Sequence, residues 1–60
     1  MKVYFESERV TKNAVRFAEV LKSDLDEPRI GTLYMKKSAL REMGWKEGQR
    51  LQVSVDIMEF

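Results

Sequence analysis

The stretch KKSALREMGWKEGQRLQVSV, residues 36–55, contains the strongest local signals for the fold. It predicts a short helix that begins with Ser38 as its N-cap and ends at Gly44. Glycine at this position adopts the left-handed conformation without steric cost. Gly48 indicates a turn, and residues 51–57 then alternate between apolar and polar side chains, as in a strand with one buried face. This part of the chain is therefore expected to form a helix, a turn and a strand in succession.

Trp45 directly follows the glycine that is expected to end the helix. In a Schellman cap, the side chain at this position commonly contacts the residue five positions earlier, which is Leu40. We therefore expect Trp45 to pack against the helix before any binding role is considered.

Two of the preceding segments alternate in the manner of strands. Residues 2–6 place Val3 and Phe5 on one face, and residues 29–36 show the same alternation. The polar residues 7–13 between the first two expected elements predict a loop. A second loop is predicted where an acidic run ends at the only proline of the chain.

Residues 13–22 fit two structures. As a helix they form one apolar stripe, whereas as a strand they bury Val15 and Phe17 and turn Arg16 outward. The strand is favoured, because it forms a hairpin with residues 2–6 to which a third strand is added. The predicted order is strand, strand, strand, helix, strand, which makes residues 1–60 a single α+β domain with a small antiparallel sheet or half-barrel.

The length of the chain indicates that this fold needs help to become stable. A 60-residue domain buries only about 60% of the surface of its unfolded chain, and natural domains of this size often add disulfides, a metal or a partner subunit. The sequence contains neither cysteine nor histidine, so disulfides and the commonest metal ligands are excluded. We therefore expect a second copy to complete the fold, as a homodimer.

The same composition argues against catalysis. Without histidine or cysteine, no Ser/His or Cys/His arrangement can form, and the sequence has no glycine-rich phosphate loop. The carboxylates of Asp24, Asp26 and Glu27 lie in a polar loop, where solvated charges are the first interpretation and loose calcium coordination is the weaker one. We expect no enzymatic activity, no cofactor and no metal site.

The sequence also predicts where the protein is found. No apolar run approaches the ~20 residues that a membrane span requires, and the N-terminal residues lack the apolar core of a signal peptide. A cytoplasmic location is expected, with no membrane partner.

Charge is distributed unevenly although the net charge is only +1. Residues 19–29 contain four acids and two bases, whereas residues 36–50 contain five bases and two acids. Together with Arg16, which is expected to point outward from the second strand, the five bases of residues 36–50 form a candidate surface for nucleic acid. The predicted binding residues are Arg16, Lys36, Lys37, Arg41, Lys46 and Arg50. Ordinary solvated surface charges are the competing interpretation of each.

Residues 31–53, GTLYMKKSALREMGWKEGQRLQV, resemble the conserved half of the AbrB/SpoVT family of swapped-hairpin barrels. The shared phrase is a glycine, a short strand, a basic helical turn, a second glycine, then lysine, glutamate, glycine and a strand. The resemblance implies a homodimer of interleaved chains and a DNA-binding regulator. Residues 11–20 and 30–40 together are also similar to a group of small bacterial proteins that carry both phrases.

Two functional hypotheses follow. In the first, the chain is a homodimeric DNA-binding module in which a two-fold axis doubles the basic residues on one surface. In the second, it is a protein-interaction or accessory module whose partner is another protein and which does not bind nucleic acid.

Overall fold

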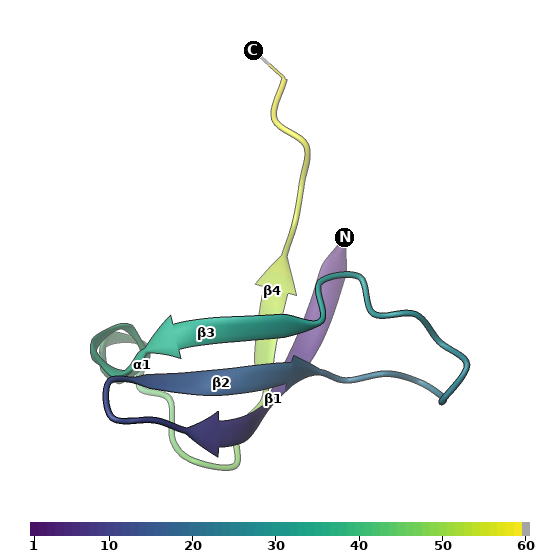
Figure 1. Ribbon diagram of the computed structural model, residues 1–60. Coiled ribbons are helices and arrows are strands. Elements are labelled where there is room, and N and C mark those ends of the chain that lie inside the picture. Colours follow the sequence, from purple (N-terminus) through teal and green to yellow (C-terminus); the bar gives the residue numbers. More distant parts are fainter. Residues whose placement is uncertain (60) are drawn as a thin grey trace.

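The computed structural model of the chain describes residues 1–59 as a curled antiparallel sheet with one short helix beside it (Figure 1). The strands are β1 (Lys2–Val10), β2 (Ala14–Glu19), β3 (Thr32–Lys36) and β4 (Leu51–Ser54), and the helix α1 (Lys37–Met43) lies between β3 and β4 in the sequence. Their order across the sheet is β3-β2-β1-β4, and each neighbouring pair is antiparallel. The predicted α+β class, the half-barrel and the order of elements are confirmed.

The sheet curls because β1 changes partner along its length. Its first residues pair with β4 and its later residues pair with β2, and Phe5 belongs to both registers, opposite Leu51 on one side and Glu19 on the other. Phe5 is 0% exposed. A strand that serves different neighbours at its two ends bends the sheet around its middle, and this bend produces the half-barrel in Figure 1.

The hydrophobic core lies on the concave side of the curled sheet. Successive side chains of a strand point to opposite faces, so the alternating apolar positions of the strands converge there. The buried residues are Val3, Phe5, Val15, Phe17, Leu40 and Leu51, with Leu33, Met35, Trp45 and Val53 packed against them. The strand interpretation of residues 14–19, with Val15 and Phe17 inward, is therefore confirmed.

The end of α1 is a Schellman cap, as predicted. Gly44 has a φ of 78°, its N–H donates to the carbonyl of Arg41 at 3.1 Å, and the N–H of Trp45 donates to the carbonyl of Leu40 at 3.0 Å. The Trp45 ring then meets the ring of Phe17 edge-on, with centroids 5.6 Å apart and planes at 77°. The expected structural role of Trp45 is confirmed.

The start of α1 differs from the prediction. Ser38 is not the N-cap, because the helix begins at Lys37 and Lys36 occupies the cap position in an extended conformation without a side-chain cap bond. The physical reason is a backbone hydrogen bond to the turn between β1 and β2. The N–H of Lys37 donates to the carbonyl of Asn13 at 3.0 Å, so a distant backbone group satisfies one of the N–H donors that the first turn of the helix leaves without a partner inside the helix.

The first loop is also shorter than predicted. Residues 7–10, expected to be loop, continue β1, and the register with β2 shifts between Ser7 and Arg9. One extra residue in one strand is a β-bulge, which interrupts the alternation from which a strand is predicted. The turn that remains is tight, because the N–H of Thr11 donates to the carbonyl of Ala14 at 2.8 Å.

The last strand ends earlier than predicted. β4 stops at Ser54, and the final bonds of its pair with β1 join Val55 and Met1, from the N–H of Val55 to the Met1 carbonyl at 2.8 Å and from the Met1 ammonium to the Val55 carbonyl at 2.9 Å. Residues 56–59 continue past this last pair. Ile57 is therefore 92% exposed, and the prediction that Val55 and Ile57 face the core is wrong.

A carboxylate holds the long loop between β2 and β3. Glu19 accepts hydrogen bonds from the backbone N–H groups of Arg29, Ile30 and Gly31 at 2.8–3.1 Å. These bonds, first that from Ile30 and then that from Arg29, lower the pKa of Glu19 below its ordinary value of 4.5. The loop is thereby tied to the end of β2. Among residues 1–59 there is no helix with the length and apolar character needed to cross a membrane.

Candidate nucleic-acid interface

Four basic side chains meet at the end of the sheet where β3 passes into α1. They are Lys12 from the turn between β1 and β2, Lys36 from the end of β3, and Lys37 and Arg41 from α1, and we call them the basic cluster. Together with Asn13 and Ser38 they line a shallow hollow of about 430 Å³. No carboxylate from residues 1–59 lines this hollow.

Backbone bonds bring these side chains together. Ala14 pairs with Lys36 in the register of β2 and β3, and the bond from Lys37 to the Asn13 carbonyl joins the start of α1 to the hairpin turn. The hydroxyl of Thr11 stiffens the same turn, since it donates to the Ala14 carbonyl at 2.9 Å and accepts from the Ala14 N–H at 3.1 Å. The positions of the charges are therefore set by the sheet and the turn.

The basic cluster has no acidic partner in residues 1–59. The ion pairs in that part of the chain join Met1 to Asp56, Arg16 to Glu8 and Arg50 to Glu6. Four cations that converge without forming an ion pair among these residues create a local positive potential, although the chain as a whole carries a net charge of only +1. Such a potential attracts anions.

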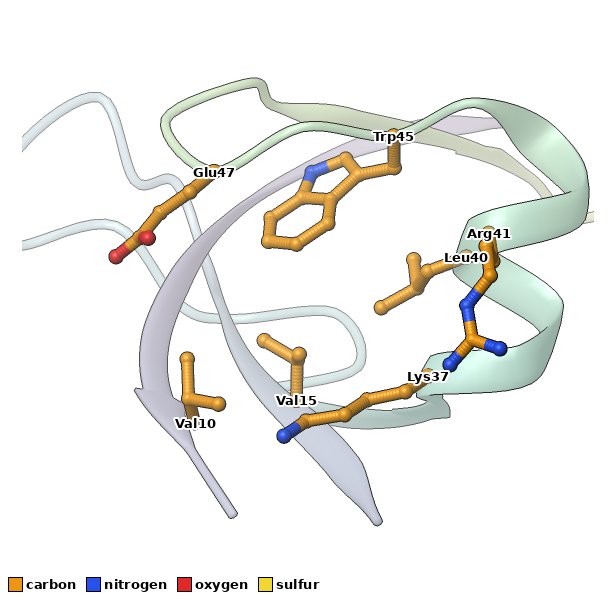
Figure 2. A pocket seen from close by; sticks show the side chains of 7 residues that line it. All are labelled: Val10, Val15, Lys37, Leu40, Arg41, Trp45 and Glu47. Carbon is orange, nitrogen blue, oxygen red and sulfur yellow. The ribbon is translucent and has the colours of Figure 1, made fainter. Parts of the chain in front are cut away.

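An apolar groove adjoins the basic cluster. Figure 2 shows Lys37 and Arg41 projecting from α1 on one side of it and Glu47 on the other, with the Trp45 ring and the aliphatic side chains between them. The groove has a volume of about 270 Å³, and its apolar lining consists of Val10, Val15, Leu40 and Trp45.

Two features keep the groove open and fixed in shape. Val10 lies at its edge and remains 51% exposed. The Trp45 ring is held in place, because its Nε1–H donates to the carbonyl of Gln49 at 2.8 Å. Cations and an accessible apolar surface therefore lie side by side.

The structure brings together three of the six predicted binding residues, namely Lys36, Lys37 and Arg41. Arg50 lies apart, in a separate hollow beside Gly44, and its guanidinium is 3.4 Å from a carboxylate oxygen of Glu6. Lys46 lies in the turn before β4 and lines neither the basic hollow nor the apolar groove. These two residues are therefore weaker candidates than the basic cluster.

Arg16 points outward from β2, as predicted, but it has partners of its own. Its Nε lies 3.4 Å from a carboxylate oxygen of Glu8, without the alignment of a hydrogen bond, and its guanidinium carbon lies 6.0 Å from the centre of the Tyr34 ring. The guanidinium is thus shared between a carboxylate and an aromatic face. It lies on the convex side of the sheet, away from the groove.

The two exposed tyrosines do not form one stacking platform. Tyr34 lies directly across from Arg16, whereas Tyr4 lies across from Gln52 and accepts a backbone bond from Val20. Val20 is four residues along the chain from Arg16, so about 13 Å of strand separates the two rings at the usual rise per residue. The other aromatic residues in the described part of the chain are Phe5 and Phe17, which belong to the core, and Trp45, which packs against it.

Sequence reasoning missed Lys12 and Asn13. Both lie in the turn between β1 and β2, and they become neighbours of α1 only because β1 continues to Val10. A search for a basic residue in the hairpin turn would have found Lys12, provided that the bulge in β1 had been recognised.

A metal site is not part of this interface. The described residues contain no group of three or more acidic, histidine or cysteine side chains that could hold a metal ion. In the acidic loop, Asp26 instead accepts the backbone N–H of Lys22 at 3.4 Å. Comparisons of the chain with known protein families, with curated proteins and with solved structures found no match.

Proposed function

We propose that this protein is a non-catalytic module that binds DNA through its phosphate backbone. The observation that carries the proposal is the basic cluster: four cations from a turn, a strand end and a helix converge in one hollow that no carboxylate of residues 1–59 lines. Phosphate contacts from lysine and arginine supply most of the affinity in sequence-independent binding. The resemblance of residues 31–53 to the AbrB/SpoVT family, many of whose members bind DNA, points the same way.

The adjoining groove extends this proposal to the nucleotide itself. Lys37 and Arg41 line both the hollow and the groove, so a phosphate on these cations places its sugar or base toward the Trp45 ring and its aliphatic neighbours. An apolar or aromatic surface next to a basic track is the arrangement of proteins that bind single strands with little sequence preference. We therefore expect single-stranded DNA to bind at least as tightly as duplex DNA.

The expected affinity is modest. Four cations per chain permit about four phosphate contacts, which corresponds to dissociation constants of roughly 10⁻⁴ to 10⁻⁶ M at physiological salt. Each contact adds about 0.7 to 0.9 to the slope of log affinity against log salt concentration. A strong dependence on salt is therefore the signature of this interface.

Fluorescence anisotropy with labelled duplex and single-stranded oligonucleotides at several salt concentrations tests the proposal. We expect the Lys36→Ala/Lys37→Ala/Arg41→Ala variant to bind at least tenfold more weakly than the native chain, with a salt slope lower by about two to three. The matched control is Lys2→Ala/Lys22→Ala/Arg29→Ala, which removes the same charge from side chains around a different hollow. Equal losses in both variants, or binding by the native chain that does not respond to salt, would contradict the proposal.

One observation favours the second candidate, a protein-interaction module. The residues that follow β4 present Val55, Ile57 and Met58 to solvent, with Met58 72% exposed. If interaction with a protein were the main function, the chain would bind neither the duplex nor the single-stranded oligonucleotide, and these exposed residues would contact a partner protein.

A further inference from the structure

The tail, residues 55–59, is an exposed segment that continues β4 past the end of its partner strand. Figure 1 shows it leading away from the sheet, and within residues 1–59 it is joined to Met1 by the backbone bonds of Val55 and by an ion pair of the Met1 ammonium with Asp56 at 3.6 Å. The sequence VDIME repeats the alternation of β4, with Val55 and Ile57 in phase with the core-facing Val53. The tail thus has the sequence of a strand but no strand beside it within the described part of the chain.

Within residues 1–59 the adjacent edge of the sheet is also free. β4 is the last strand in the order, so among these residues it is bonded on one side, which faces β1. Val55 directs both of its backbone groups toward Met1, and in an antiparallel ladder the residues next to it, Ser54 and Asp56, direct theirs to the opposite side. An unpaired row of this kind is a template for another strand.

We propose that β4 and the tail pair with the same segment of a second copy of the chain, antiparallel, across a two-fold axis at Val55. In this register Val55 lies opposite Val55 of the second copy as a pair without mutual hydrogen bonds. Ser54 exchanges backbone bonds with Asp56 of the second copy, and Val53 lies opposite Ile57. The same pairs form twice, once on each side of the axis, as a closed dimer requires.

Self-complementarity identifies the second copy as the partner. The register extends the concave faces of both sheets, since Val53 at the margin of one core is covered by Ile57 of the other copy, which is 92% exposed in the single chain. The same register also keeps the Asp56 carboxylates of the two copies from lying opposite each other. An axis shifted by one residue, to Asp56, places two carboxylates directly opposite each other, which is unfavourable.

This interface goes beyond the proposed function, because it does not depend on DNA binding. It joins the two sheets near the N-terminal end of β1, whereas the basic cluster lies beyond the C-terminal end of that strand. Since nine residues of strand span about 30 Å, the two basic clusters lie far from the axis, at opposite ends of the dimer. Each cluster then binds nucleic acid separately, in place of the doubled charge on one surface expected from the sequence.

A single engineered cysteine tests the register, because the native sequence contains none. Opposite residues of a pair without mutual hydrogen bonds have Cα atoms about 4.5 Å apart, within the range of a disulfide. In Val55→Cys, mild oxidation should therefore link two copies within minutes at micromolar concentration. Ser54→Cys is the matched control, since in this register its Cα lies about 8 Å from its symmetry mate, beyond disulfide reach.

Crosslinking is read on non-reducing gels, and sedimentation of the cysteine-free chain gives the association constant. We expect Val55→Cys to crosslink at least tenfold faster than Ser54→Cys, and Ile57→Lys to weaken the native dimer at least tenfold while its circular dichroism stays unchanged. Equal crosslinking of the two cysteines would overturn the register. A native chain that sediments as a monomer at millimolar concentration, or an Ile57→Lys variant that dimerises as well as the native chain, would overturn the interface, whatever the DNA titration shows.

Discussion

The two ends of β1 differ in how their surroundings are satisfied. At the Val10 end, a tight turn and a bond from the Lys37 N–H to the Asn13 carbonyl fix the backbone, and the charges of the basic cluster form no ion pair within residues 1–59. At the Met1 end, the chain continues past the end of β4, and in the described part of the chain no strand pairs with residues 56–59, whose apolar side chains Ile57 and Met58 are exposed. In the described part of the chain, one end therefore has a hydrogen-bonded backbone with unpaired cations, whereas the other end has an unpaired sheet edge.

This difference shows what each end is suited to bind. A rigid surface of cations suits a polyanion, because the side chains need little further ordering of the backbone. An unpaired edge with an alternating tail suits a strand, whose hydrogen bonds and side chains would complete the sheet. We therefore expect the two ends to bind different partners and to respond to separate substitutions, as the following predictions set out.

The largest effect is expected at the core that both ends share. Phe17→Ala removes a ring that is 0% exposed and lies against Trp45, which should cost roughly 3–5 kcal/mol. Because a 60-residue domain has a total stability of only about 3–9 kcal/mol, most molecules should be unfolded and both ends lost. Circular dichroism during thermal unfolding checks this. Tyr34→Ala on the next strand is the control, and an unchanged melting temperature for Phe17→Ala would contradict the described core.

A smaller effect is expected from the cap of α1, which belongs to the basic end. Gly44 has a φ of 78°, and an added Cβ would meet no atom within 4 Å, so Gly44→Ala suffers only the conformational penalty of about 1 kcal/mol. Urea unfolding measures this loss, and Gly44→Asn should recover part of it because asparagine tolerates the left-handed region. If alanine and asparagine were both neutral, the cap would not contribute to stability.

Removal of a single charge tests whether Lys12 belongs to the nucleic-acid interface. Lys12→Ala removes one cation from the hollow, so the slope of log affinity against log salt should fall by about one, with a weakening that is uniform across sequences. Lys22→Ala removes the same charge from the loop after β2 and should leave the slope unchanged. The comparison is made by anisotropy titration, and indistinguishable slopes would place Lys12 outside the interface.

The smallest effect concerns the loop that Glu19 holds. Because hydrogen bonds lower the pKa of Glu19 in the folded state, its carboxylate contributes stability that is present above pH 4.5 and is lost as the pH falls through the lowered pKa. In denaturant titrations from pH 7 to pH 2, the native chain should lose more stability than Glu19→Gln. Parallel curves for the two proteins would mean that these hydrogen bonds do not stabilise the fold.

Local chemistry predicted much of this fold from the sequence. The left-handed Gly44, the packing of Trp45 and the inward alternation of Val15 and Phe17 depend on neighbours close in sequence, and all three were predicted correctly. Errors arose where a distant segment decides the outcome. Asn13 supplies the carbonyl that moves the helix start from Ser38, and nothing in the helical sequence indicates it.

The ends of the strands were mispredicted for a related reason. The alternation of the last segment continues through Ile57, but a strand also needs a partner, and β1 pairs no further than Met1 and Val55. The bulge before Arg9 hid the second half of β1, and with it the turn that brings Lys12 to the candidate site. Half of the predicted binding residues meet in the structure, because they are neighbours along one short stretch of chain.

The central claim is that DNA binds at the end of the sheet where β3 passes into α1. Titration of an unlabelled single-stranded oligonucleotide into ¹⁵N-labelled protein, followed by amide NMR shifts at low salt, tests it most directly. We expect the perturbed amides to be those of residues 11–13, 36–41 and 45, while those of residues 51–59 stay unchanged. Shifts concentrated in the tail, or none at millimolar oligonucleotide, would contradict it.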